Sequence, residues 1–226
     1  MSDYTTGNNV RIGDNVKIGA GVKIEDNVVI YDNVQIGENT NIGPNVVLGH
    51  PLGSYYSDPE YKNLETTIGK NCIIRVNSVI YCGTNFADNV ATGTSAVVRE
   101  RCTVGEGTRI GTLVQFENDT VVGKNVLIET ATHITAFMKI GDNVFIGPQV
   151  VCTNDNQMGR GKDIKLIGPT IEDDARIGGN AILLPGVKVG RNSVVGAGSV
   201  VTRDVEPNTM AYGVPAKPVG KVPEPE

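Results

Sequence analysis

Histidine and cysteine are the residue types in this chain best suited to chemistry near neutral pH. There are two histidines, His50 and His133, and imidazole is a common general base because it changes charge near neutral pH. Two histidines cannot make a three-histidine zinc site within one chain, and the cysteines show no CxxC spacing, so we expect no metal. We interpret the cysteines as buried apolar groups in a reducing compartment: Cys72, Cys82, Cys102 and Cys152.

These candidates lie within a six-residue repeat. Ile, Val or Leu recurs every six residues in three blocks, 12–48, 68–152 and 171–201, with few exceptions. A second apolar residue often lies two positions earlier, which is the alternation of a strand. Gly commonly follows the repeated position and Asn comes two residues later, and both tolerate the positive φ of tight corners. Three such units predict a triangular coil of 18 residues, with parallel strands stacked about 4.8 Å apart.

Two insertions interrupt the repeat. Leu48 and Ile68 are 20 residues apart, and Cys152 and Ile171 are 19 apart, where six are expected. Because residues 18 apart share a face, Ile134 and Cys152 align, and Leu48 joins them once the first insertion is removed. Loops at 50–66 and 153–170 should therefore leave the same corner. Loops on a rigid scaffold often carry function.

His133 lies at that same corner. It directly precedes the inward-pointing Ile134, so its imidazole should point outward. We interpret it as a general base. The alternative is a solvated surface histidine.

The repeated [LIV]-G-x-x-x-x pattern resembles that of the hexapeptide-repeat acyltransferases, which fold as left-handed parallel β-helices and commonly form trimers. The resemblance implies an all-β protein: a left-handed parallel β-helix over 1–204, with its two loops, and a Pro-rich C-terminal extension over 205–226. The tail from Val205 is not expected to continue the coil, because it is rich in proline. A homotrimer is also expected because one convex prism lacks a concave pocket, which clefts between prisms would supply.

Three segments carry more specific resemblances. The run ATHITAFMKIGDN (131–143) is similar to the base-bearing segment of a sugar-nucleotide O-acyltransferase of lipid A synthesis, although Ala136 stands where that family has its second histidine. The run NVFIGPQVVCTND (143–155) resembles amino-sugar N-acetyltransferases that act on nucleotide-linked sugars. That match implies that Asn154 and Asp155 face the acceptor, with Asp155 holding an ammonium or hydroxyl group. The alternative is an Asx-type turn at the start of a loop.

The C-terminal run VVGAGSVVTRDVEPNTMAYGVPAKPVG (194–220) resembles the acetyl-CoA-binding segment of the same enzymes. The match implies that backbone amides at Gly196 and Ala197 contact the pantetheine arm, and that Arg203 and Lys217 contact the phosphates. Cations suit pyrophosphate because charge-assisted hydrogen bonds are strong.

These resemblances predict acetyl transfer from acetyl-CoA to the amino group of a nucleotide-linked sugar, by direct attack on the thioester with His133 as base. Two alternatives remain: O-acylation or transfer of a longer acyl chain to a sugar, and a non-catalytic binding scaffold. The net charge of −5 gives no footprint for nucleic acid. No apolar run approaches 18 residues and the start lacks signal-peptide features, so we expect a cytoplasmic protein without a membrane partner.

Overall fold

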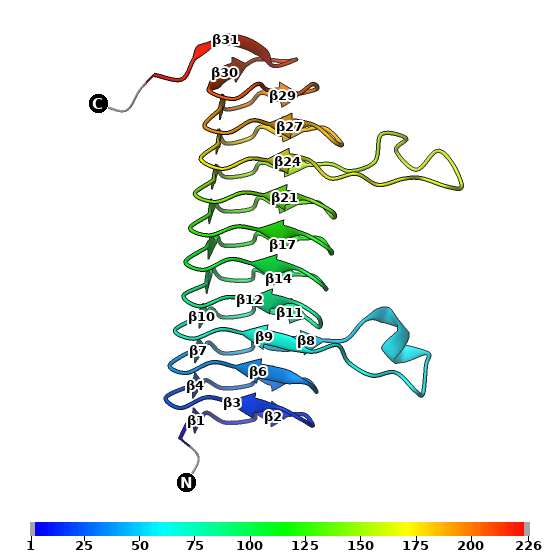
Figure 1. Cartoon of the computed structure of the whole chain (residues 1–226). Helices are drawn as coiled ribbons and strands as arrows, with labels where there is room; N and C mark the ends of the chain where they lie inside the picture. Colours follow the sequence, from blue (N-terminus) through cyan, green and yellow to red (C-terminus); the bar gives the residue numbers. More distant parts are fainter. Residues whose placement is uncertain (1–2, 224–226) are drawn as a thin grey trace.

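The computed structural model describes residues 3–223 and shows a parallel β-helix built from stacked triangular coils (Figure 1). Each coil gives one short strand to each of three sheets, and paired strands lie 18 residues apart wherever no loop intervenes, as in Phe116 and Ile134. The predicted parallel β-helix is confirmed. Residues 1–2 and 224–226, at the ends of the two predicted segments, lie outside the described residues.

The strands fall into sheets that we name A, B and C. Sheet A contains β1 (Thr5–Thr6), β4 (Lys23–Ile24), β7 (Asn41–Ile42), β10 (Ile73–Ile74), β13 (Ala91–Thr92), β16 (Arg109–Ile110), β19 (Leu127–Ile128), β22 (Phe145–Ile146), β25 (Arg176–Ile177), β28 (Val194–Val195), β30 (Thr209–Tyr212) and β31 (Lys217–Lys221). Sheet B contains β2 (Arg11–Ile12), β5 (Val29–Ile30), β8 (Val47–His50), β11 (Val79–Tyr81), β14 (Val97–Val98), β17 (Gln115–Phe116), β20 (His133–Ile134), β23 (Val151–Cys152), β26 (Ile182–Leu183) and β29 (Val200–Val201). Sheet C contains β3 (Lys17–Ile18), β6 (Val34–Ile36), β9 (Thr66–Ile68), β12 (Asn85–Phe86), β15 (Thr103–Val104), β18 (Val121–Val122), β21 (Lys139–Ile140), β24 (Thr170–Ile171) and β27 (Lys188–Val189).

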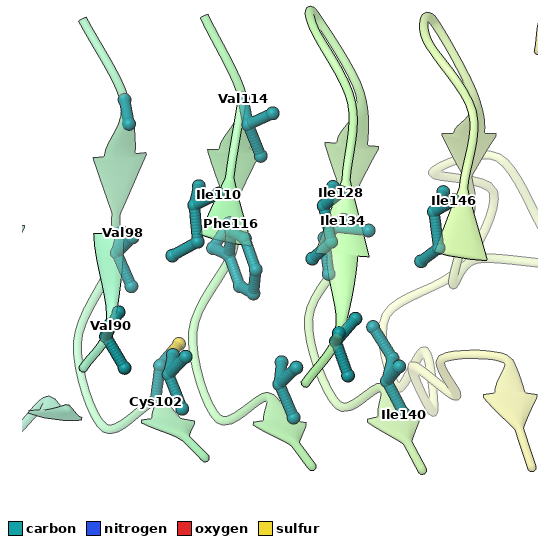
Figure 2. Packing of buried hydrophobic residues seen from close by; sticks show 14 of the residues in the cluster. Val90, Val98, Cys102, Ile110, Val114, Phe116, Ile128, Ile134, Ile140 and Ile146 are labelled. Carbon is teal, nitrogen blue, oxygen red and sulfur yellow. The ribbon is translucent and has the colours of Figure 1, made fainter. Parts of the chain in front are cut away.

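The repeated apolar residues fill the interior of the prism. Ile110, Ile128 and Ile146 follow one another along sheet A, and Val98, Phe116 and Ile134 do so along sheet B (Figure 2). Nearly all of these side chains are fully buried. Most of them are Ile, Val or Leu, so the column is aliphatic rather than aromatic. All four cysteines are buried and unpaired, as predicted.

Asparagine shapes many of the corners between strands. Asn125 and Asn143, for example, have φ near +55°, and the side-chain amide of Asn125 donates to Asn143 Oδ1 in the next coil at 3.4 Å. Asn accepts this left-handed conformation more readily than most residues. The corner residues therefore both turn the chain and bond one coil to the next.

Both insertions project from the same side of the solenoid (Figure 1). The first, loop 1 (51–65), follows β8 and includes the 3₁₀ turn η1 (Gly53–Tyr56); the second, loop 2 (153–169), follows β23. Strands β8 and β23 both belong to sheet B, so the prediction of a common corner is confirmed. His133, on β20, lies in the same sheet, one strand from β23 and four strands from β8.

The C-terminal segment differs from the prediction. Val205 bridges Val189, and β30 pairs in parallel with β28, so that Ala211 is buried above Val195. The expectation that the chain leaves the coil at Val205 is wrong, because Pro207 falls between these pairing positions and leaves them intact. Strand β31 then packs back antiparallel on β30. Among residues 3–223 no helix is long and apolar enough to cross a membrane.

Candidate active site

His133 lies on the outer surface of sheet B with its ring available. It pairs with Gln115 in the coil below and Val151 in the coil above, and its backbone N–H donates to Val150 O at 2.9 Å. The side chain is half-buried, and within residues 3–223 no hydrogen bond or ion pair engages the imidazole. A rigid strand thus presents a histidine whose nitrogens are open to a ligand.

The surface around His133 is apolar. The outward positions of sheet B are Val29, Val47, Val79, Val97, Val151, Ile182 and Val200, interrupted by Arg11, Gln115 and His133. The outward positions of sheet C are instead mostly Lys, Thr, Asn and Gln. An apolar stripe along one face of a solenoid favours burial against another surface.

The corners on either side of this face break the Asn rule. Elsewhere in the solenoid each corner residue with positive φ is Asn, Asp or Gly. The exceptions are Ser95, Leu113, Ala131 and Gln149 at the A–B corner, and Arg101 and Phe137 at the B–C corner. Within residues 3–223, none lies at the C–A corner. Leu113 and Phe137 are also 55% and 43% exposed, so burial does not explain them. Unfavourable backbone conformations persist where function requires them. The six exceptional residues lie at the two corners on either side of sheet B, the sheet that contains His133.

A network of charged side chains lies at the B–C corner between the two loops. Arg99 donates to Glu117 at 2.7 Å and to the buried carboxylate of Glu100 at 2.9 and 3.1 Å. Arg101 holds Asp119 through two hydrogen bonds of 2.8 and 2.7 Å. This network was not predicted, although the 18-residue spacing of the pairs 99/117 and 101/119 could have indicated it.

Loop 2 begins one coil above His133. Asn154 is half-buried, and its carbonyl accepts the N–H of Ile167, which closes the base of the loop. Both carboxylate oxygens of Asp155 accept loop amides, from Gln157 and Gly159, each at 2.7 Å. The amides of Gly159 and Gln157 lower the pKa of Asp155. Asp155 therefore forms an Asx-type turn that shapes the loop and keeps its negative charge at the surface.

The predicted cofactor residues lie at the C-terminal end of the solenoid. The Gly196 N–H donates to Ala211 O at 2.9 Å, and the Tyr212 ring covers the glycine so closely that any Cβ there would meet it at 2.0 Å. Residue Ala197 is exposed, and its amide makes no protein hydrogen bond in the described chain. Of the two predicted amides, only that of Ala197 has no acceptor among the described residues.

Arg203 and Lys217 are exposed at the same end. Neither cation has an ion-pair partner within residues 3–223. Lys217 and Arg203 are both connected to β29. The N–H of Ala216, the residue before Lys217, donates to Val200 O on this strand, and Arg203 lies two residues after the strand ends. Ala197 lies three residues before β29, and β29 is three strands above His133, or about 14 Å at the rise of a parallel sheet.

Two families of repeat proteins match the solenoid. The family described as bacterial transferase hexapeptide (six repeats) matches residues 15–50, and the hexapeptide repeat of succinyl-transferase matches residues 170–203. Their period is the one that builds the coils described above. The solenoid is therefore built from hexapeptide repeats similar to those of the bacterial hexapeptide transferases.

Several relatives of this hexapeptide-repeat protein are acyl-group transferases. The galactoside O-acetyltransferase of Lactococcus lactis is 32% identical over 154 residues, or 68% of this chain and 62% of the relative. The acyl-[acyl-carrier-protein]–UDP-N-acetylglucosamine O-acyltransferase of Sinorhizobium fredii is 31% identical over 66% of this chain and 51% of its own. The crystal structure of PerB from Caulobacter crescentus, in complex with CoA and GDP-perosamine, is 30% identical over 55% of this chain and 54% of that chain, with a TM-score of 0.48. The chain spans from 26% to 62% of the length of the curated relatives it matches.

Proposed function

We propose that this hexapeptide-repeat protein transfers an acetyl group from acetyl-CoA to the amino group of a nucleotide-linked amino sugar. The observation that carries the proposal is the open imidazole of His133, on the face that bears both loops and is framed by unfavourable corner residues. The resemblance of residues 143–155 to nucleotide-sugar amino N-acetyltransferases supports the choice of acceptor. The acyl-transfer activities of the Lactococcus and Sinorhizobium relatives support acyl transfer in general.

In this proposal the acceptor amine attacks the thioester carbonyl directly. The C–N bond forms as His133 takes the proton from the amine nitrogen, and the C–S bond then breaks. The proton passes from the imidazole to the departing CoA sulfur, so His133 is restored. A cysteine relay is disfavoured because burial raises the pKa of Cys102 and Cys152 to about 12, which keeps these thiols protonated.

Acceptor and donor groups would both lie above His133, at opposite corners of sheet B: loop 2 leaves the B–C corner after β23, and Ala197 lies at the A–B corner between β28 and β29. We assign Asn154 to acceptor binding from above, with Asp155 holding the shape and negative charge of loop 2. We assign the free Ala197 amide to the pantetheine arm, and Arg203 and Lys217 to the CoA phosphates. The satisfied amide of Gly196 contributes by turning the chain beneath Tyr212 rather than by contacting CoA.

The apolar stripe of sheet B supports a homotrimer with His133 at the seam between subunits. A single prism is convex, and packing one prism beside another would cover the valines and enclose the imidazole in a cleft. The four unpaired cysteines suit a reducing compartment, so we place the reaction in the cytoplasm.

A second candidate is acetylation of a sugar hydroxyl, which the Lactococcus relative favours. The test is to incubate the purified protein with acetyl-CoA and a matched panel of UDP-, dTDP- and GDP-linked sugars, with and without an amino group, and to identify products by mass spectrometry. Transfer to amines supports the proposal, whereas transfer only to hydroxyls supports the second candidate. Activity only with acyl carriers would identify a longer-chain acyltransferase. The absence of both acetyl-CoA binding and acyl transfer would support the alternative of a non-catalytic scaffold.

Substitution tests the donor site separately. Replacing Arg203 and Lys217 together with Ala should raise the KM for acetyl-CoA about tenfold or more, because two charge-assisted contacts are lost. Lys221→Ala is the matched control, since Lys221 is exposed on the same strand as Lys217. Equal effects of the control and the double variant would remove these cations from the donor site.

A further inference from the structure

A pocket lies on the opposite side of loop 1 from His133. It has a volume of about 200 Å³ and lies between loop 1 and the two coils that precede it. Its lining includes Asp14, Tyr31, Asp32, Tyr55, Tyr61 and Lys62. Tyr31 directly follows β5, which is five strands from His133 in sheet B. One small ligand therefore cannot occupy this pocket and reach His133 of the same chain.

Three tyrosine rings form a rigid wall of the pocket. Tyr55 is nearly perpendicular to Tyr31, at 6.3 Å between ring centroids and 82°, and to Tyr61, at 5.8 Å and 83°. The Tyr61 hydroxyl accepts the N–H of Leu52 at 3.0 Å and donates to Asn63 Oδ1 at 2.8 Å. Because edge-to-face pairs and these bonds order the rings before any ligand arrives, little ordering is left for binding.

The polar groups of the pocket carry both signs of charge. Asp32 uses Oδ1 to accept the N–H of Asp14 at 2.8 Å, which leaves Oδ2 open. The Asp14 carboxylate and the Lys62 ammonium have no hydrogen-bonding partner within the described residues. The two carboxylates would repel a phosphate or another anion, whereas the ammonium would repel an organic cation. A neutral ring with hydroxyl groups can form hydrogen bonds with all three charged groups, since hydroxyls donate to carboxylates and accept from ammonium.

We propose that this pocket binds a single carbohydrate ring, with the apolar face of the ring against Tyr55 and its hydroxyls on Asp14, Asp32 and Lys62. The volume is below the roughly 300 Å³ at which pockets for drug-sized ligands begin, which suits one ring rather than a nucleotide. This saccharide site does not depend on the proposed acetyl transfer, because it uses none of the residues assigned to that reaction.

The test is saturation-transfer NMR on the full protein with glucose, galactose, rhamnose and N-acetylglucosamine as probes. At least one sugar should receive saturation on the ring protons of one face, and this signal should survive in His133→Ala. Tyr55→Ala and Asp14→Asn should each weaken binding about tenfold. Tyr56→Ala is the matched control, because Tyr56 is 72% exposed and lies outside the pocket lining.

Three outcomes would overturn the proposal. They are no saturation transfer to any sugar, sugar binding that Tyr55→Ala and Asp14→Asn leave unchanged, and binding of tetramethylammonium or AMP in preference to sugars. Circular dichroism of each variant separates loss of the site from loss of the fold. Failure here would leave acetyl transfer untouched, since that reaction is measured by product formation.

Discussion

At the scale of single residues, His133 is distinguished by its surroundings rather than by its type. It is one of three polar interruptions in an otherwise apolar outer column of sheet B, and its ring has no protein partner in the described chain. The position gives a general base what it needs, which is a fixed strand beneath it and a free nitrogen above.

The first prediction is that His133→Gln lowers kcat/KM for the acceptor by about 10²- to 10⁴-fold, because the amine proton loses its acceptor. The thermal shift with acetyl-CoA should remain, since the donor residues lie three strands away. Steady-state kinetics from pH 6 to 9 provide the measurement. Gln115→Ala, in the coil below, is the control. Full activity of His133→Gln across this range would exclude a catalytic role.

At the scale of elements, some corners hold residues whose types disfavour the left-handed backbone conformation found there. Leu113 has φ of +58° and Phe137 has φ of +65°, and left-handed backbone costs such residues about 1–2 kcal/mol relative to Gly. In the described part of the chain, corners away from sheet B show no such exceptions, which ties the exceptions to that surface.

The second prediction is that Leu113→Asn stabilises the protein by about 1 kcal/mol and raises Tm by a few degrees, because Asn fits the corner better. Thermal unfolding monitored by circular dichroism measures the change. The reverse substitution, Asn125→Leu at a C–A corner, should destabilise by a similar amount. A fall in stability for Leu113→Asn would show that contacts of the leucine outweigh the backbone.

The third prediction concerns acid. The hydrogen bond from Arg101 lowers the pKa of Asp119 below its ordinary value of 3.8. A carboxylate whose folded pKa is lowered contributes stability above its unfolded pKa and loses that contribution as pH falls through the folded value. The stability lost in Asp119→Asn should therefore be largest above about pH 4 and shrink below it.

Urea unfolding at pH 6 and pH 3 measures this difference. Asp163→Asn is the control, because Asp163 is exposed on loop 2 and has no ion pair among the described residues. An Asp119→Asn penalty that is independent of pH would mean that the Arg101 contact acts through shape rather than charge.

At the scale of the whole molecule, the solenoid leaves one face poorly suited to water. Sheet B exposes a stripe of valine and isoleucine, whereas sheet C is mostly polar at the same positions. Strand β30 and the returning β31 close the C-terminal end of the column, as a solenoid requires to protect its last coil.

The fourth prediction is that the protein is a trimer, whose mass measured by analytical ultracentrifugation is three times the 23.9 kDa of one chain. Val151→Lys should dissociate it and abolish transfer, because a charge would be buried at the seam. Val121→Lys is the matched control, since Val121 is the equivalent outward valine on sheet C and is 50% exposed. A monomeric, active wild type would place the whole site within one chain.

The repeat by itself determined the parallel β-helix, the burial of the cysteines and the common corner of both loops. Each coil contacts chiefly its neighbours, so a six-residue pattern carries nearly all of the information that stacking needs. The position of His133 followed from the same arithmetic, because Ile134 aligns with Cys152 at a spacing of 18.

Only the tertiary structure decided the details that lie between coils or beyond the repeat. The network of Arg99 and Glu117, the Tyr212 ring over Gly196, and the bonds of Asp155 to its own loop depend on side-chain directions that no period specifies. The extra coil at β30 forms because Ala211 can still fill the column above Val195, whatever the prolines nearby. Repetition encodes the scaffold, whereas contacts outside the repeat determine which amides, rings and charges remain open to ligands.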